Sequence, residues 1–207
     1  MKIVLFLFRH GSTAGNVIKR YIGATDEKLC EIGRNEIENE KKSLISLKNT
    51  PESAAFMHIL ANKSKIYVSP LQRTQETAQI LFPDNPKQIV PDFREMSFGA
   101  FEGKNAAEME KTALGEHYRA WVESGCETKC PDSDLFLGED KAGFSNRICN
   151  ALKDLADSEK WQNGEIIPIV CHGGTINALL ERFAVTRKGY FEWRTAHGAY
   201  RFEEVEL

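Results

Sequence analysis

Two histidines stand where long apolar runs of the chain end. Arg9 and His10 come directly after the apolar run 2–8, and His172 comes directly after the run 165–171. Each histidine is followed by glycine. Runs without polar alternation are typical of buried parallel strands, and ligands of open α/β sheets bind outside the carboxyl ends of such strands. We therefore expect the two histidines to share one site.

Arg73 and Glu95, near the ends of two further strand-like runs, would complete a set of side chains suited to phosphoryl transfer. Arginine's planar fork fits phosphate oxygens, so Arg9 and Arg73 would make a cationic pocket. A neutral imidazole can attack phosphorus, and neighbouring cations favour its unprotonated form. A carboxylic acid near a phosphate dianion has a raised pKa and can protonate the leaving oxygen, a role for which Glu95 is the candidate.

Each residue also has a plainer explanation when it is taken alone. A histidine at a strand end is often a hydrogen-bonded structural residue, and a lone glutamate is usually solvated. Cys126 and Cys130 could be half a zinc site, but no second Cys/His pair has the right spacing. Cys171, beside His172, is better explained as a small buried apolar residue than as a nucleophile. The joint occurrence of the histidines, arginines and glutamate at strand ends favours the chemical interpretation.

Alternating strands and helices must position these side chains. Strand-like runs cover 2–8, 65–69, 87–91, 165–171 and 199–206, and helical periodicity covers 31–47, 71–82, 106–122, 144–155 and 175–183. This alternation predicts a three-layer α/β/α sandwich with a largely parallel central sheet. Helices that begin near 71 and 174 would also offer backbone N–H groups to a phosphate. The segment 92–143 contains no clear strand and many turn residues, as lids and binding loops do.

Composition narrows the classes of partner. The 207 residues are 42% hydrophobic, which predicts one globular domain. The net charge of −3 indicates neither a nucleic-acid nor a membrane partner. The first apolar run is too short to span a membrane and lacks the features of a signal peptide. Five scattered cysteines do not form a disulfide framework, so we expect a reducing, cytoplasmic location.

The motifs resemble those of the histidine phosphatase superfamily, which includes the cofactor-dependent phosphoglycerate mutases. Its opening motif, Arg-His-Gly-x-Thr-x-x-Asn, is met by residues 9–16, and Ser-Pro-Leu-x-Arg-Thr-x-x-Thr-Ala is met by residues 69–78. Residues 94–103 resemble the motif that carries the acid, and 172–174 resemble the late His-Gly-Gly. The resemblance extends over most of the chain, and together the motifs are highly specific.

The resemblance implies a covalent mechanism. His10 would be the nucleophile that forms a phosphohistidine, and Glu95 would be the general acid and then the base for water. The other implied residues bind the phosphoryl group (Arg9, Arg73 and His172) or assist at its pocket (Thr13, Asn16 and Gly173). The resemblance implies no metal ion and no cofactor, because the side chains supply the cations.

Some positions depart from the family pattern. Ser12 stands where glutamate is common, Cys30 where threonine is common, and Glu36 where glutamine is frequent. The stretch before Ser69 is longer than usual, which predicts an insertion at about 48–62 that forms an extra surface helix. We expect a single domain over 1–207, with a variable lid or substrate segment at about 96–143. At the end of that segment, 138–147 resembles the family's Gly-Glu-Ser…Phe…Arg, with aspartate for serine.

The resulting hypothesis is a metal-independent phosphatase of a small-molecule phosphate ester, of the α-ribazole phosphatase-like or the broad-specificity branch, with α-ribazole 5′-phosphate as one candidate substrate. Trp121, Phe136, Tyr118 and His197 could shape the leaving-group pocket, although core packing is the simpler role for Trp121 and Tyr118. A phosphoglycerate mutase is the first alternative, but the arginine pair and proline-rich lid of mutases are not recognisable. A non-catalytic phosphate-binding regulatory protein is the second, and its signature would be the loss of a chemical residue. A metal-dependent hydrolase lacks an evident carboxylate partner set.

Overall fold

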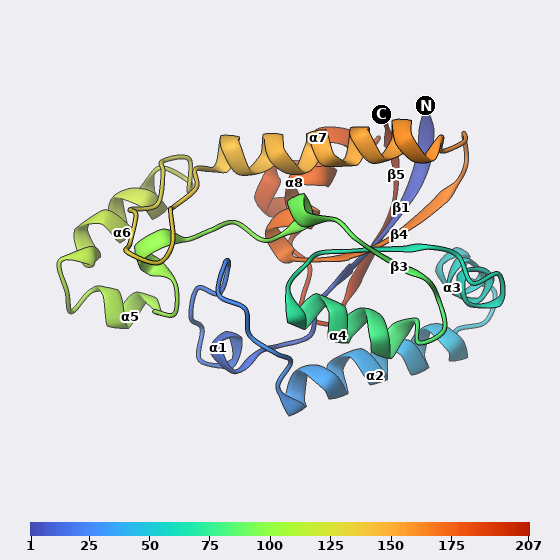
Figure 1. The fold of residues 1–207 in the computed structure, drawn as a ribbon, viewed down its shortest axis with the longest axis horizontal. Coiled ribbons are helices and arrows are strands. Elements are labelled where there is room, and N and C mark those ends of the chain that lie inside the picture. The colour runs from blue at the N-terminus through green and yellow to red at the C-terminus, as the bar shows by residue number, and fades with distance from the viewer.

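A five-stranded sheet forms the centre of the computed structural model, which describes residues 1–207 (Figure 1). The strands are β1 (Lys2–Arg9), β2 (Ile66–Val68), β3 (Lys87–Ile89), β4 (Ile166–Cys171) and β5 (Tyr200–Glu206), in the order β3-β2-β4-β1-β5. The pairs β1–β4, β2–β4 and β2–β3 are parallel, whereas β5 runs antiparallel to β1. All five predicted strands and the largely parallel sheet are confirmed.

The sheet is covered on both faces, as its uninterrupted apolar strands require. In β1, Leu5 and Leu7 join the apolar cluster formed with α7 (Lys141–Glu159) and α8 (Gly173–Phe183). Phe6 and Phe8 point to the other face, into the cluster formed with α2 (Glu31–Ser46), α3 (Pro51–Ala61) and α4 (Gln72–Leu81). Figure 1 shows these two helix layers above and below the sheet. None of the helices combines the length and the apolar composition needed to cross a membrane.

The predicted insertion at 48–62 does form a helix, α3, whose first turn is capped by the Thr50 side chain. Its description as a surface helix is wrong in part, because one face of it is in the core. Phe56 is fully buried and its ring lies 5.3 Å from Phe82 and 6.3 Å from Phe8. The apolar residues of α3 are spread around the helix, so their sequence pattern alone does not show which face is buried.

The variable segment lies beyond one end of the sheet, on the left in Figure 1. The single helix expected over 106–122 is wrong: the structure has α5 (Ala106–Met109) and α6 (Leu114–Glu123) instead. Thr112 causes the break, because its hydroxyl donates to the carbonyl of Met109 and accepts from the N–H of Leu114. Such local side-chain bonds compete with the helical backbone ladder.

The remaining short elements connect the layers. They are α1 (Ala14–Val17) and the three 3₁₀ turns η1 (Pro91–Phe93), η2 (Gly99–Phe101) and η3 (Tyr190–Trp193). The register of the sheet then decides where the chemical residues meet. Arg9 pairs with Cys171, so the next residue of each strand, His10 and His172, emerges at the same edge.

Candidate active site

The two strand-end histidines lie side by side in the protein interior. The ring centroids of His10 and His172 are 5.1 Å apart, and the two residues are 3% and 0% exposed. Nδ1 of His10 lies 2.7 Å from the carbonyl oxygen of Gly11. Since a carbonyl can only accept, Nδ1 carries the proton and Nε2 keeps its lone pair. His10 is therefore held as the tautomer whose Nε2 can act as a nucleophile.

Burial and neighbouring cations keep this imidazole neutral. The pKa of His10 is well below its ordinary value, first because the ring is buried and then because Arg73 and Arg9 are close. The pKa of His172 is lowered well below normal by the same causes, burial first and Arg73 second. A protonated histidine cannot attack phosphorus, so this environment provides the reactive form at neutral pH.

Ser69, at the end of β2, orients His172. Its hydroxyl lies 2.6 Å from Nε2 of His172, and the other ring nitrogen, Nδ1, is buried without a partner in the protein. When the hydroxyl donates to Nε2, Nδ1 carries the proton and is free to donate to a phosphoryl oxygen. Ser69 belongs to the middle sequence motif, but the sequence gives no sign that it pairs with a residue 103 positions later.

Both arginines are held by their outer nitrogens. Arg9 donates to the carbonyl of Thr195 at 2.6 Å, and its other terminal nitrogen lies 2.7 Å from Nε2 of His197. Arg73 is fully buried and donates to the carbonyls of residues 22, 23 and 25. In each guanidinium the Nε is buried without a partner. With Nδ1 of His172, in the tautomer that accepts from Ser69, these make three unpaired buried donors around His10, a group of donors that matches the oxygens of a phosphoryl group.

His197 is a site residue whose place the sequence did not predict. It was expected at the leaving-group pocket, but the structure places it against Arg9, at a separate pocket of about 660 Å³. Its ring is 5.5 Å from that of His10. Burial, followed by the charge of Arg9, lowers the pKa of His197 to about 3. His197 is therefore a neutral acceptor that holds Arg9 without competing for a proton.

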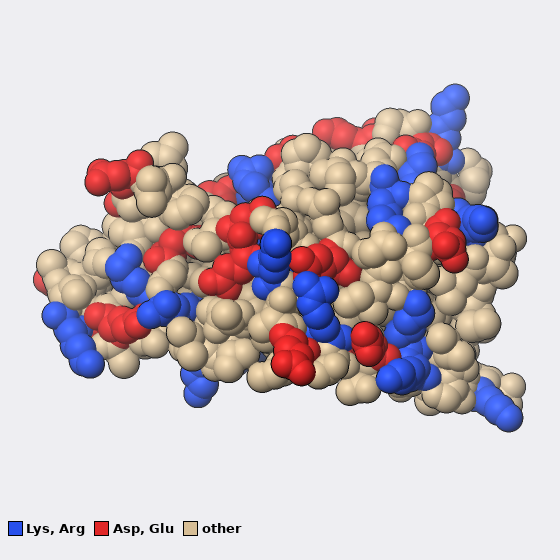
Figure 2. Space-filling view, turned by 60° about the horizontal axis from the view of Figure 1, so that its bottom comes forward, with Lys and Arg blue, Asp and Glu red and all other residues tan.

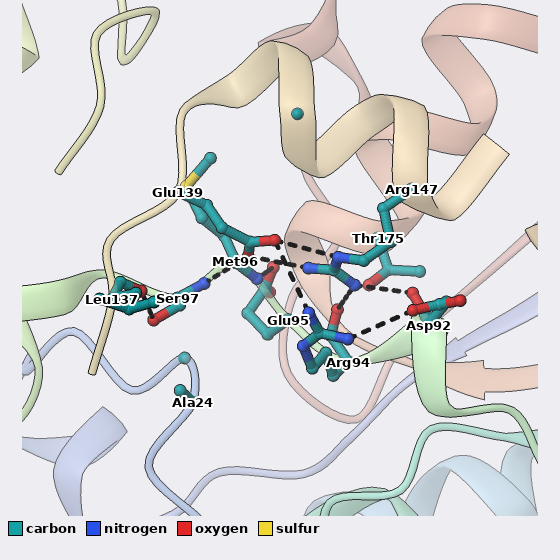
Figure 3. A network of polar contacts seen from close by, with 12 residues as sticks. Ala24, Asp92, Arg94, Glu95, Met96, Ser97, Leu137, Glu139, Arg147 and Thr175 are labelled. Atoms are coloured by element: carbon teal, nitrogen blue, oxygen red, sulfur yellow. Dashed lines mark hydrogen bonds and ion pairs between the residues drawn. The ribbon is translucent and has the colours of Figure 1, made fainter. Parts of the chain in front are cut away.

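Glu95 occupies the N-terminus of α8. Its carboxylate accepts from the N–H of Met96 and the N–H of Gly174, both at 2.9 Å, and the residue is 9% exposed. Gly174 has to be small here, because a Cβ would collide with this carboxylate. Figure 3 shows Glu95 beside a polar network in which Glu139 and Arg147 bind its neighbours in the chain.

At each of the two expected helix N-termini, a carboxylate of the chain already binds one N–H group. Glu95 takes the N–H of Gly174, and Asp26 takes the N–H of Gln72 in α4 at 2.7 Å. The positive end of a helix attracts any anion, and in this protein two carboxylates of the chain are bound there. A phosphate contact by the other N–H groups of these helix ends, that of Gly173 among them, stays a prediction.

Glu102 builds the loop that holds Arg73. Its buried carboxylate accepts from the N–H groups of residues 23, 24, 25 and 98 and from the hydroxyl of Thr25. The carbonyls of the same loop accept from Arg73. Glu102 was part of the acid motif but had no predicted role. Five donor groups bound to one carboxylate make Glu102 the organising residue of the loop that holds Arg73.

Three predicted assisting residues take less direct positions. Thr13 and Asn16 cap the short helix α1: Thr13 Oγ1 accepts from the N–H of Asn16, and Asn16 Oδ1 accepts from the N–H of Thr13. Asn16 lines the same pocket as His197. Gly173 packs against Arg9, where a Cβ would lie 3.1 Å from the guanidinium carbon. Their contact with substrate stays a prediction.

Ser12 and Glu36, two of the positions that depart from the family pattern, are hydrogen-bonded to each other. Glu36 of α2 accepts from the N–H of Ser12 at 2.8 Å and from its hydroxyl at 2.9 Å. A glutamate at position 12 would place two carboxylates together, so serine suits the glutamate at 36. Gly11, next to this pair, passes so close to Gly33 that a Cβ would meet its backbone. The contact fixes the loop that carries His10.

A pocket of about 710 Å³ adjoins the site, and both Arg9 and Glu95 line it. Its aromatic walls are Tyr21, Phe98, Tyr118, Trp121, Tyr190 and Phe191. Trp121 is 4% exposed and belongs to the core cluster, as expected, and it also lines this pocket. Phe136 is not among the lining residues. The indole N–H of Trp121 is buried without a partner.

The cationic character is local to this interior site. On the face in Figure 2, basic and acidic side chains are interspersed rather than gathered by sign. No group of three or more His, Cys, Asp or Glu side chains is arranged to hold a metal ion. The positive charge available to a bound anion near His10 comes from Arg9 and Arg73.

Comparison with known proteins yields a match over nearly the whole chain. The model of the histidine phosphatase superfamily (branch 1) matches residues 5–201. An adenosylcobalamin/α-ribazole phosphatase from Escherichia coli K12 is 29% identical over 183 residues, which cover 86% of this chain and 77% of that protein. A 2,3-bisphosphoglycerate-dependent phosphoglycerate mutase from Tropheryma whipplei (strain Twist) is 23% identical over 192 residues, covering 86% and 81%.

Solved structures show the same fold. The crystal structure of the α-ribazole phosphatase from Shigella flexneri superposes with a TM-score of 0.72 at 24% sequence identity. The superposition covers 96% of this chain and 89% of that one.

Proposed function

The chain belongs to the histidine phosphatase superfamily, and from that premise we propose that it hydrolyses a small-molecule phosphate monoester through a phosphohistidine at His10. One observation carries the proposal: His10 is neutral, its tautomer leaves Nε2 free, and three unpaired buried donors lie around it. This arrangement provides a nucleophile and the partners of a phosphoryl group in one place. The protein side chains supply the positive charge, so the proposed reaction needs no metal ion.

In the proposed reaction Nε2 of His10 attacks phosphorus as the bond to the leaving oxygen breaks. Arg9, Arg73 and Nδ1 of His172 stabilise the charge on the transferred phosphoryl oxygens. Glu95, in its acid form, gives its proton to the leaving oxygen. Glu95 then takes a proton from water, which attacks the phosphohistidine and releases inorganic phosphate and neutral His10.

The position of Glu95 supports one location for the leaving group. A general acid must lie within hydrogen-bond reach of the leaving oxygen, and Glu95 lines the aromatic pocket. The leaving group therefore extends into walls made by Tyr21, Phe98 and Trp121. Aromatic walls suit a planar apolar body better than a small polar acid. This supports α-ribazole 5′-phosphate, which carries a benzimidazole base, as the substrate.

The mutase alternative has less support at the same pocket. The carboxylate of a phosphoglycerate would require an available cation beside the leaving group. Two cations at the outer lining of the pocket, Lys141 and Arg194, are possible partners. The Lys141 ammonium pairs with Glu127 at 2.7 Å and lies 4.0 Å from Glu181, whereas the Arg194 guanidinium lies over the ring of Phe191 and pairs with no carboxylate. The mostly aromatic walls favour a planar leaving group and hence phosphate release, and Arg194 is the cation that the mutase alternative would use.

The test is phosphate release from a panel of esters in the presence of a chelator. The panel contains an aryl phosphate, α-ribazole 5′-phosphate, sugar phosphates and 3-phosphoglycerate, the last also assayed for isomerisation. We expect the highest kcat/KM for α-ribazole 5′-phosphate. Isomerisation without release would identify a mutase, and inactivity on the whole panel would favour a phosphate-binding regulatory role.

A further inference from the structure

Arg147 of α7 binds the backbone on which Glu95 is carried (Figure 3). One terminal nitrogen of its guanidinium donates to the carbonyl of Asp92 at 2.8 Å and to that of Arg94 at 3.2 Å. The remaining nitrogens bind Glu139 in a bidentate pair, at 3.0 and 2.8 Å. The side chain of Arg147 is only 13% exposed. It therefore fixes the chain immediately before Glu95.

Glu139 fixes the chain immediately after Glu95. Its carboxylate accepts from the N–H of Ser97 at 2.9 Å, and its own N–H donates to the carbonyl of Ser97 at 2.9 Å. The hydroxyl of Ser97 adds a bond to the carbonyl of Leu137 at 2.6 Å. Ser97 and Glu139 thus join the two ends of the variable segment by hydrogen bonds. This segment contributes Phe98 and Trp121 to the aromatic pocket.

We propose that the Glu139–Arg147 ion pair is a positioning device that sets the Glu95 carboxyl for proton transfer to the leaving group. The proposal rests on the phosphatase function proposed above. Glu95 lies between Arg94 and Ser97, the two backbone positions that the pair holds. A bidentate arginine–carboxylate pair has a fixed geometry. Here the two partners of the pair also bind backbone groups on either side of Glu95, so they hold that backbone in place.

The consequence is specific to one chemical step. Proton transfer requires heavy atoms about 2.6–3.2 Å apart, and a misplacement of about 1 Å can cost on the order of 10²-fold. Alkyl esters need the proton because an alkoxide leaves poorly, whereas an aryl ester such as 4-nitrophenyl phosphate scarcely needs it. The kinetic constant kcat/KM reports the steps up to release of the leaving alcohol. Loss of the pair should therefore steepen the dependence of kcat/KM on the basicity of the leaving group.

The experiment measures kcat/KM for a series of aryl and alkyl phosphates with Arg147→Gln. We expect a loss of about 10- to 100-fold on alkyl esters and less than about threefold on the nitrophenyl ester. Arg147→Lys keeps the positive charge but not the planar guanidinium that binds a carboxylate with two bonds. Its kcat/KM on alkyl esters should therefore lie between those of the wild type and Arg147→Gln. The matched control is Arg119→Gln, which breaks the exposed Arg119–Glu110 pair within the same segment and should leave the dependence unchanged.

A double variant separates positioning from general stability. If the ion pair acts through Glu95, Arg147→Gln should cost less than about threefold when Glu95→Gln is already present. Equal losses on aryl and alkyl esters, or losses that multiply in the double variant, would overturn the proposal. Should Arg147→Gln fail to fold, Arg147→Lys and Glu139→Gln provide the same comparison. An inactive wild-type protein would overturn the phosphatase function and this inference together, whereas an unchanged dependence in an active protein would overturn the inference alone.

Discussion

Acidification should destabilise this protein through its three buried histidines. The pKa values of His10 and His172 lie well below normal and that of His197 is about 3, in each case chiefly because the ring is buried. The ordinary pKa of histidine is about 6.5, so the unfolded chain takes up protons at a pH where the folded protein does not. Stability is therefore complete above about pH 6.5 and is lost as the pH falls below it.

The size of the effect follows from the number of histidines. Each histidine that stays neutral in the folded protein lowers the free energy of unfolding by about 1.4 kcal/mol for every pH unit below about 6.5. Lowering the pH from about 7.5 to 5.5 should then reduce the free energy of unfolding by about 4 kcal/mol for three histidines. That is a large part of the roughly 5–15 kcal/mol typical of a domain. Replacing His197 by Gln removes one of the three and should reduce the loss by about a third.

Urea unfolding at the two pH values measures this loss directly. His117→Gln is the matched control, because His117 lies exposed on α6, and it should leave the loss unchanged. A loss below about 1 kcal/mol in the wild type, or the same loss in the His197 variant as in the wild type, would refute the assignment of three neutral buried histidines.

Three further predictions concern the chemistry. His10→Ala should abolish phosphate release while the unfolding midpoint at pH 7.5 falls little or not at all; residual activity above a few per cent of wild type would contradict the covalent mechanism. Glu95→Gln should lower kcat/KM on alkyl esters about 10²-fold more than on aryl esters, and an equal loss on both would argue against its role as the acid. Glu102→Ala should free the loop that holds Arg73 and weaken competitive inhibition by inorganic phosphate about tenfold or more. Unaltered inhibition by phosphate would show that Glu102 does not act on the phosphate pocket.

The sequence predicted the sheet and the chemical residues for one physical reason. Buried parallel strands appear as apolar runs, and their carboxyl ends meet at one edge, so the position of His10 after β1 and of His172 after β4 was enough to predict their meeting. Arg73 and Glu95 were candidates for the same reason, since they lie near the ends of two further strand-like runs, and the family resemblance added the covalent role of His10. These predictions depend on local patterns that are visible in the amino-acid sequence itself.

The supporting contacts were not predictable because they join distant residues without a local signal. His197 reaches Arg9 across 188 positions, and Glu102 binds a loop nearly 80 positions earlier. The break of the predicted helix 106–122 depends on one hydroxyl, that of Thr112, which helical periodicity does not register. The occupation of two helix N-termini by carboxylates likewise depends on tertiary placement.

The most direct test of the account is the identity of the phosphorylated residue. Glu95→Gln should still be phosphorylated by 4-nitrophenyl phosphate but should hydrolyse the phosphoenzyme slowly, because the base for water is missing. Quenching this variant in alkali, which preserves phosphohistidine, followed by peptide mass spectrometry should place one phosphoryl group on His10. Phosphate release by the wild type with no covalent phosphate in either protein, or with the phosphoryl group on another residue, would contradict the account.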